Sequence, residues 1–219
     1  MNIKRLIKYN LDILISKKYI VFFLATFLFP IALNFSNAMY FEMIIPLCGV
    51  FIFTNTMFYE KDYRVYQSFY MSSIKKSKIF LIRLLLNIIF YICIAIPFYF
   101  YIKVILKNTF VDAFANTSDV SWLIIIALGG INYLLFGLIG VTIANISGKP
   151  IMSIGITGAY VVIWMAEYVR FANVIINPFS YSAGCNDYII YKIVTIILIL
   201  IMLVFNCYYL DKKFYRLKT

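Results

Sequence analysis

Six long apolar runs follow one another along the chain, each separated from the next by a shorter polar or basic stretch. About 20 apolar residues is the length that an α-helix needs to cross the hydrocarbon core of a bilayer, and modest tilt accommodates longer runs. The pattern therefore predicts six transmembrane helices, at roughly 19–36, 39–59, 79–102, 121–146, 150–171 and 188–210.

The residues before the first run follow a different pattern. Within 3–17, apolar side chains such as Ile3, Leu6 and Leu14 recur at helical spacing, while Lys4 and Asp12 take the other side. An amphipathic helix of this kind lies among the lipid headgroups. Because charged residues interrupt its apolar positions and no small-residue cleavage site follows, we do not interpret it as a signal peptide.

Composition agrees with a membrane protein. The 219 residues are 64% hydrophobic and 13% charged, with a mean hydropathy of +0.91. This is more apolar surface than a soluble core can hide, so the bilayer must cover much of it. Six spans and short connectors use the whole length, and we expect an all-α integral membrane protein with a single transmembrane domain over residues 1–219.

The net charge of +11 indicates how the chain is oriented. In a soluble protein it would suggest nucleic acid, but in a membrane protein Lys and Arg collect in cytoplasmic segments. With a cytoplasmic N-terminus, fifteen basic residues fall inside: Lys4, Arg5, Lys8, Lys17, Lys18, Lys61, Arg64, Lys75, Lys76, Lys78, Lys149, Lys212, Lys213, Arg216 and Lys218. Four fall outside: Lys103, Lys107, Arg170 and Lys192. We therefore expect both termini in the cytoplasm and no nucleic-acid partner.

The chain lacks the residues that most membrane enzymes use. It has no histidine, which disfavours Ser/His and His-metal proteases, phosphohistidine phosphatases and haem proteins. No Asp-x-x-Asp pair is present to hold Mg²⁺. The stretch "GVTIANISGKP" ends like a phosphate loop, but Gly140 is too far from Gly148-Lys149 and Pro150 replaces the hydroxyl residue, so it predicts a tight turn. We expect no catalytic site, metal or cofactor in this chain.

The four cysteines have no close spacing, and three of them fall inside apolar runs: Cys48, Cys93, Cys185 and Cys207 make up the set. This distribution indicates inert packing residues rather than a disulfide framework, a redox pair or a metal site.

Charged residues in or beside the spans are few. Glu42, Arg83, Glu167 and Arg170 all fall near predicted span ends. Glu167 and Arg170 are three residues apart and can pair on one helix face, either as an interfacial ion pair or as part of a gate at the outer mouth. An ion-driven secondary transporter would need a charge at mid-bilayer depth, and none is predicted there.

Small residues recur four apart in the fourth and fifth spans, as Gly140/Ala144 and Gly155/Ala159. Such spacing lets helix backbones approach closely. Two interpretations stay open: packing between these two helices of one chain, or a surface that shifts during a conformational cycle.

The longest connector predicted to be cytoplasmic, Glu60–Lys78, is also the most polar. At helical spacing, Tyr63, Tyr66, Phe69 and Tyr70 gather on one face. Such a helix can lie on anionic lipid. However, large aromatics beside a few charges are also typical of protein interaction hot spots, and the acidic Glu60 is badly placed against anionic lipid. We favour docking to a soluble partner.

Several features resemble the permease subunits of type-2 ABC exporters, which have six spans, an N-terminal interfacial helix and a coupling helix between spans two and three. The resemblance runs through Glu60-Lys61, then Met71-Ser72-Ser73-Ile74-Lys75-Lys76, then Arg83, with Ser73 where the family usually has proline. The stretch "NPFSY", Asn177–Tyr181, is similar to the family's turn between spans five and six, which partly re-enters the outer leaflet. Small Tyr- and Ile-rich members export amphipathic peptides from Gram-positive bacteria, including phenol-soluble modulins, or protect against lantibiotics.

The resemblance implies partners and roles for particular residues. A second permease chain would complete a path for an amphipathic peptide, and separate ATPase subunits would bind ATP and Mg²⁺. The residues expected to couple to the ATPase are Glu60, Arg64, Tyr66, Phe69, Tyr70, Met71 and Lys75. Those expected to line the path are Phe51, Phe53, Asn55 and Trp164, because aromatic and amide groups hold amphipathic cargo without a fixed charge. The outer gate is expected at Glu167, Arg170, Pro178 and Phe179.

The competing interpretation is a membrane protein that does not transport. An immunity protein, a sensor or an assembly factor that binds its partner within the bilayer would share the spans and the charge distribution. A Walker-motif ATPase encoded beside this chain favours export, and its absence favours this alternative.

Overall fold

The computed structural model describes residues 7–8, 11, 40–62, 75–105, 122–167, 170, 174–185 and 187–216, and every regular element in this part of the chain is a helix. Its principal elements are the π-helix η1 (Tyr40–Ile44) and the α-helices α4 (Ile45–Asp62), α6 (Lys76–Ile105), α7 (Trp122–Ser147), α8 (Pro150–Ala166) and α9 (Tyr188–Arg216). Three of these helices, α6, α7 and α9, are long and apolar enough to cross a membrane. The expected class, an all-helical membrane protein, is confirmed to this extent.

The predicted spans correspond to these elements with shifted ends. The second span becomes η1 followed directly by α4, while the third and sixth are longer than predicted because α6 and α9 extend into basic sequence. The fifth is shorter: α8 ends at Ala166, since Glu167 leaves helical geometry at φ −115° and ψ 17°. The first span at 19–36 and nearly all of the interfacial helix at 3–17 lie outside the described residues.

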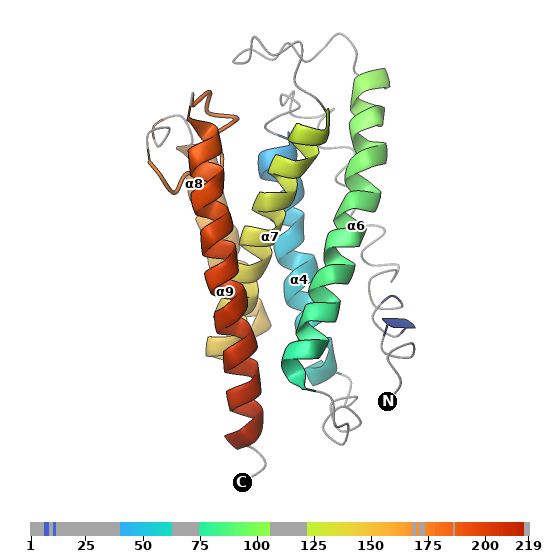
Figure 1. Ribbon diagram of the computed structural model, residues 1–219, viewed down its shortest axis with the longest axis vertical. Helices are drawn as coiled ribbons and strands as arrows, with labels where there is room; N and C mark the ends of the chain where they lie inside the picture. Colours follow the sequence, from blue (N-terminus) through green and yellow to red (C-terminus); the bar gives the residue numbers. More distant parts are fainter. Residues whose placement is uncertain are drawn as a thin grey trace.

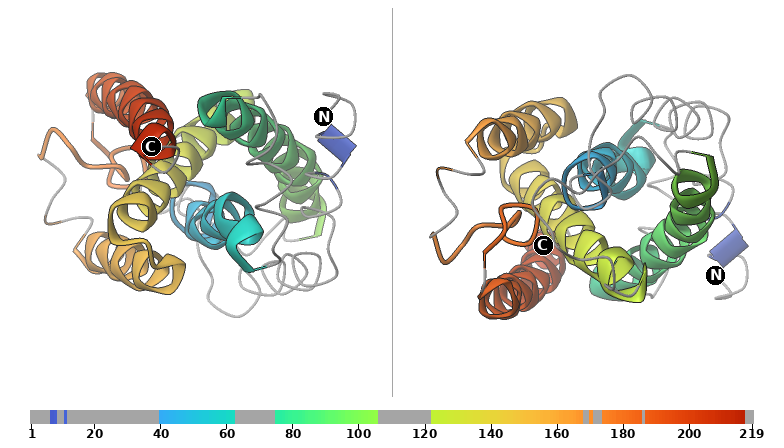
Figure 2. Two further views of the ribbon diagram at one scale, coloured as in Figure 1. Left: turned by 90° about the horizontal axis from the view of Figure 1, so that it is seen from below. Right: turned by 90° about the horizontal axis from the view of Figure 1, so that it is seen from above.

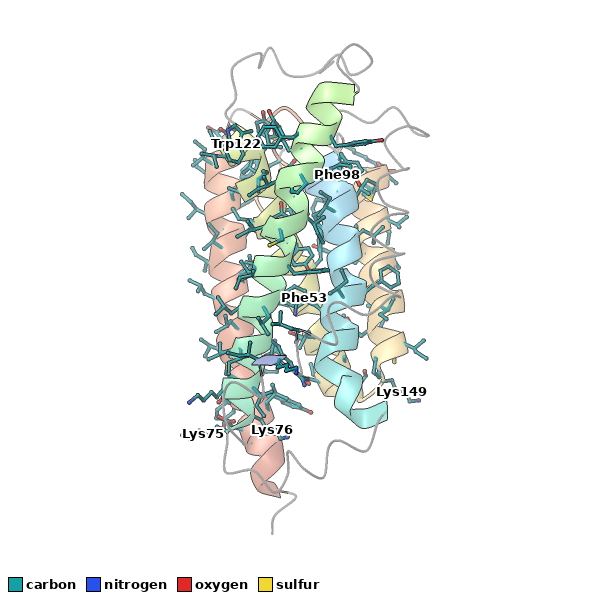
Figure 3. The ribbon with its side chains drawn as sticks, turned by 90° about the vertical axis from the view of Figure 1, so that its right-hand side faces the viewer. Phe53, Lys75, Lys76, Phe98, Trp122 and Lys149 are labelled. Atoms are coloured by element: carbon teal, nitrogen blue, oxygen red, sulfur yellow. The ribbon has the colours of Figure 1, made fainter. Side chains whose placement is uncertain are left out.

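The helices form a bundle around α7, which contacts each of the other helices named above; α4, α7 and α9 run in one direction, and α6 and α8 run in the opposite direction (Figures 1 and 2). One end of the bundle holds the end of α4, the start of α6, the α7–α8 turn and the end of α9. Lys75, Lys76 and Lys149 lie at this end, which we call the basic end, and Trp122 and Phe98 lie towards the other (Figure 3). We call that other end, where α8 leads into residues 174–187, the loop end.

The α7–α8 connection is the tight turn that the sequence predicts. Gly148 adopts φ +71°, a left-handed conformation that glycine takes without steric cost. Its N–H donates to the carbonyl of Ala144 at 2.9 Å. Pro150 then begins α8, where its missing N–H costs no helical hydrogen bond.

Glycines let α4 pack directly against α7. A Cβ atom at Gly137 would lie 2.6 Å from the ring of Phe53, and one at Gly140 would lie 2.9 Å from Oγ1 of Thr54. Ala144, one turn beyond Gly140, is fully buried. Close packing at Gly140 therefore occurs, but its nearest contact is Thr54 of α4, whereas the prediction named only the fifth span, whose Ser153 lies further away at 3.5 Å.

The same prediction is wrong for Gly155/Ala159. Both residues are exposed on α8, and a Cβ atom at Gly155 would meet no atom within 4 Å. Instead α8 turns Ser153, Thr157 and Val161 inward. The hydroxyl of Ser153 donates to the carbonyl of Gly140, which joins α8 to α7.

The outer surface of α9 is apolar over most of its length. Its exposed large side chains are Ile189, Ile190, Ile193, Ile196, Ile197, Leu200, Ile201, Val204, Phe205 and Tyr208. Soluble monomers rarely expose a contiguous apolar face of this extent to water. In a membrane protein, such a face is covered by lipid.

Candidate functional site

A buried ion pair lies inside the bundle near the loop end. The Lys192 ammonium nitrogen is 2.6 Å from Oε1 of Glu42, and the two residues are 4% and 1% exposed. Glu42 comes from η1 and Lys192 from the second turn of α9, so the pair joins segments that are far apart in the sequence.

The Lys192 ammonium group also donates two hydrogen bonds. Its nitrogen donates to Oδ1 of Asn132 at 3.0 Å and to the carbonyl of Pro178 at 2.6 Å. The amide of Asn132, on the central helix α7, donates to that same Pro178 carbonyl at 2.7 Å and to the carbonyl of Glu42 at 2.9 Å. One asparagine therefore ties η1, α9 and the loop end together.

The second carboxylate oxygen of Glu42 binds the loop directly. It accepts the backbone N–H of Ser182 at 2.7 Å and the Ser182 hydroxyl at 2.6 Å. We refer to Glu42, Asn132, Pro178, Ser182 and Lys192 as the ion-pair network.

The loop segment 177–180 turns back into the bundle. Asn177, Phe179 and Ser180 are fully buried, and Oδ1 of Asn177 accepts the N–H of Phe179 at 2.8 Å to close the turn. The Phe179 ring packs against Phe136 of α7, with 5.8 Å between centroids. Irregular backbone can lie at membrane depth only where protein satisfies its polar groups, and the ion-pair network satisfies the Pro178 carbonyl.

The ion-pair network holds the 177–180 turn in apolar surroundings through one ion pair and several hydrogen bonds. Desolvating two charges is costly, and the attraction between them offsets that cost only where the remaining donors and acceptors are also paired. Charged residues inside a membrane bundle mark functional sites by default. We therefore take the ion-pair network and the 177–180 turn as the candidate functional site.

The nearest thiol does not add nucleophilic chemistry to the site. Burial, followed by the negative charges of Glu42 and Asp187, raises the pKa of the Cys185 thiol. A raised pKa keeps cysteine in its unreactive thiol form. Cys93 and Cys207 are free thiols, and within the described residues no group of three or more His, Cys, Asp or Glu side chains could hold a metal ion.

The four residues predicted for the outer gate separate into two pairs. Pro178 and Phe179 belong to the buried turn. Glu167 and Arg170 do face each other, but at 3.7 Å and with side chains 43% and 78% exposed. An ion pair so exposed contributes little, and no hydrogen bond within the described segments links it to the turn.

Of the residues predicted to line the path, the structure describes the side chains of Phe51, Phe53 and Trp164. Phe53 is fully buried and packs edge-on against Tyr133, with 5.2 Å between centroids. Phe51 is half-buried on the same helix, and Trp164 is half-buried on α8 beside Tyr160. The side chain of Asn55 lies outside the described residues.

Most of the residues predicted to couple to the ATPase also lie outside the part of the chain that the structure describes. This applies to the side chain of Glu60 and to residues 63–74, which include Arg64, Tyr66, Phe69, Tyr70 and Met71. Lys75 is described and exposed, directly before α6. The helices that flank the segment, α4 and α6, end and begin at the basic end.

Sequence reasoning missed the pairing at the centre of the network. Lys192 was expected among the outer basic residues, and Glu42 as one of several charges near span ends. Asn132 and Ser182 were not among the predicted site residues. The available signal was a single acid and a single lysine, each within one turn or two of the start of an apolar helix, but sequence alone does not tell which of these charges meet.

Comparisons with protein-family models, with curated proteins and with solved structures gave no match to this chain. The resemblance to exporter permeases therefore rests on the sequence features described above.

Proposed function

We propose that this chain is the transmembrane subunit of an ATP-driven exporter of the type-2 ABC class in a bacterial cell membrane. It would pair with a second permease chain, the same or a sister, to form a path for an amphipathic or hydrophobic substrate. Peptides such as cytolytic toxins or antimicrobial peptides fit this description. Separate ATPase subunits would hydrolyse ATP at the cytoplasmic face.

The observation that carries the proposal is the continuity of η1 and α4. The helical stretch from Tyr40 to Asp62 carries Glu42 near one end and leads into the polar segment 63–74 at the other. At about 1.5 Å per residue it extends over roughly 30 Å. One element therefore links the expected ATPase-docking segment to the ion pair that holds the 177–180 turn.

This geometry supports a coupling mechanism. Closure of ATPases below the membrane would displace the polar segment and tilt the attached helices α4 and α6. Because Glu42 moves with α4, its bonds to Ser182 and Lys192 would be strained or broken, and the turn at the loop end would be released. Cargo would then leave on the outer side, and re-formation of the ion pair would close the exit.

The distribution of charge is consistent with this orientation. Lys75, Lys76 and Lys149 share the basic end with the end of α4, after which the polar segment follows in the sequence (Figures 1 and 3). Basic residues mark the cytoplasmic side of membrane proteins, which is the side where an ATPase would find the polar segment.

Co-purification tests the docking step. Replacement of Tyr66, Phe69 and Tyr70 by alanine removes the aromatic face of the segment, and we expect recovery of the ATPase with the tagged chain to fall at least about tenfold, because aromatic side chains dominate such interfaces. A matched control replaces three exposed residues at the loop end by alanine, namely Phe100, Leu123 and Ile124. This control should leave recovery of the ATPase unchanged.

Undiminished ATPase recovery by the triple aromatic variant would remove the docking proposal. If no Walker-motif ATPase accompanies even the unaltered chain, the alternative of a non-transporting immunity protein, sensor or assembly factor is favoured.

A further inference from the structure

An apolar groove lies between α6 and α7. Its volume is about 390 Å³, within the range of about 300–1,000 Å³ that is usual for small-molecule sites in proteins. Aliphatic side chains make up most of its walls, with Ile88, Ile92 and Ile96 coming from α6 and Leu123 and Ile126 from α7. None of the described residues that line it carries a charge.

The inner wall of the groove is aromatic and held in place. Tyr91 is 4% exposed, and its hydroxyl donates to the carbonyl of Ile126 at 2.7 Å, which ties α6 to α7. The Tyr91 and Tyr133 rings lie 5.0 Å apart between centroids. On α7 the small residues Ala127 and Gly130 leave the space open, and a Cβ atom at Gly130 would lie 3.1 Å from the Tyr91 ring. The groove is therefore a preorganised feature of this helix pair.

The groove is continuous with apolar surface on the outside of the bundle. Ile92 and Leu123 line it and are 43% and 58% exposed. Next to them, Ile89 on α6 and Ile124 on α7 are also exposed. Because α6 and α7 are long and apolar enough to cross a membrane, lipid covers side chains of this kind. The groove therefore opens towards lipid.

The length of the groove matches one leaflet of a bilayer. Along α7 it extends from Trp122 to Leu134, which is roughly 18 Å at about 1.5 Å per residue. The hydrocarbon core is about 30 Å thick, so one leaflet supplies about 15 Å. Trp122 lies towards the loop end (Figure 3), and its ring is 6.0 Å from that of Phe100. Since Trp is enriched where the membrane meets water, we place the groove within the leaflet at the loop end.

Size and polarity decide between the possible occupants. Ordered water needs two to four polar partners, and apolar cavities stay dry. A helix is about 10 Å across with its side chains, so over the same length it takes up roughly 1,400 Å³, which is several times the space present. An apolar cavity of about 150 Å³ admits the six carbons of benzene, so about 390 Å³ admits roughly fifteen carbons. That is the size of one lipid acyl chain.

We propose that this groove binds one acyl chain of a membrane lipid from the leaflet at the loop end. The chain lies along α7, with its carbonyl end near Trp122 and its methyl end near Leu134. Because the described lining carries no charge, the headgroup stays outside, and lipids with different headgroups bind equally. The proposal does not depend on whether this protein transports a substrate.

Photolabelling of the full chain tests the proposal. The chain is placed in phosphatidylglycerol vesicles that contain a trace of phosphatidylglycerol with a diazirine midway along one acyl chain, and adducts are mapped by mass spectrometry of peptides. Lipid that merely surrounds the bundle also labels exposed α9 residues such as Ile193 and Ile197. We expect labelling of the groove residues to exceed labelling of α9 at least about threefold, because a bound chain has a longer residence time. Equal labelling of the two surfaces would overturn the proposal.

A pair of variants ties the labelling to the groove. Ala127→Phe should reduce labelling of the groove by at least about half, because the added ring takes up space that the acyl chain needs. Ala159→Phe makes the same change at an exposed position on α8 and should leave labelling of the groove unchanged. Equal labelling of the groove in these two variants contradicts the proposal. If Ala127→Phe does not fold, the ratio of groove to α9 labelling in the unaltered chain decides.

A photoreactive residue at the rim distinguishes a lipid from a protein segment. Leu123→p-benzoylphenylalanine is irradiated in the same vesicles, and the mass of the product is measured. We expect a lipid adduct. A crosslink to a second copy of the chain, or to residues 19–36 of the same chain, would assign the groove to protein and overturn the proposal.

Discussion

At the scale of single residues, Lys192 has the most demanding environment in the described part of the chain. Its charge is buried, and it is balanced by Glu42 at 2.6 Å and by two further oxygen acceptors. Removing one partner of such a pair leaves the other charge buried and unpaired, which costs about 3–5 kcal/mol. The ion pair is therefore expected to stabilise the folded protein, in addition to its proposed role of holding the 177–180 turn.

This reasoning predicts the effect of Lys192→Met. Methionine keeps the length of the side chain but leaves the Glu42 carboxylate without its cation, so Tm should fall by about 10 °C in a thermal unfolding measurement in detergent. Lys212→Met is the matched control, since Lys212 is exposed at the far end of the same helix.

A second variant keeps this test specific to the pair. The double variant Glu42→Gln/Lys192→Met should lose less stability than the sum of the two single variants, because each single change already removes the interaction. Equal losses for Lys192→Met and Lys212→Met, or strict additivity of the pair, would contradict a structural ion pair.

Sequence reasoning at this scale found part of the site. Pro178 and Phe179 were identified because "NPFSY" resembles a known turn, and both belong to the buried turn. Lys192 was not identified, because a lysine near a span end is equally compatible with snorkelling to the headgroups. Its burial depends on an acid about 150 positions earlier and on Asn132, and single-sequence periodicity carries no information on such long-range contacts.

At the scale of elements, the contact between α4 and α7 determines how a displacement of α4 is transmitted. Gly49 lies against Tyr133, and Gly137 lies against Phe53. The helices approach so closely at these points that a methyl group does not fit. Dense packing of this kind transmits strain rather than absorbing it.

Two glycine variants test this packing. Gly137→Ala places its methyl group 2.6 Å from the Phe53 ring, and overpacking should cost about 1–3 kcal/mol. Gly155→Ala makes the same change on α8 with no atom within 4 Å, so it should be neutral or slightly stabilising through higher helix propensity.

Thermal unfolding of the two glycine variants under identical conditions gives the comparison. If Gly137→Ala is as stable as Gly155→Ala, α4 and α7 are further apart than described. That result would contradict the proposal that α4 and α7 move together as a rigid unit.

Helices were the most predictable feature of the fold, since long apolar runs specify them directly. Their ends were less predictable. The hydropathy pattern predicts that the fifth span continues to residue 171, because Val169 and Phe171 keep the sequence apolar. The helix ends at Ala166 instead, since hydropathy does not determine backbone geometry. The orientation of Gly155 was also missed, since small-residue spacing identifies a face but not the helix that covers it.

At the scale of the whole molecule, the two ends of the bundle have different chemistry. The basic end carries Lys75, Lys76 and Lys149, and the ion-pair network lies near the loop end. We propose that the basic end and the polar segment 63–74 lie on the cytoplasmic side of the membrane. The charge count predicted lysines gathered at one end of the bundle, because this requires no knowledge of which residues are in contact, but it did not predict the ion pair near the other end.

The most direct test of the account is the side of the membrane on which the polar segment lies. In a chain with its four cysteines replaced by serine, Tyr70→Cys is treated with a membrane-impermeant maleimide in intact cells and in inside-out vesicles. Lys149→Cys reports the basic end, and Arg170→Cys, an exposed position, reports the loop end. The account predicts that Tyr70→Cys and Lys149→Cys react only in inside-out vesicles and that Arg170→Cys reacts in intact cells. Reaction of Tyr70→Cys in intact cells would contradict it, because a segment outside the cell cannot bind a cytoplasmic ATPase.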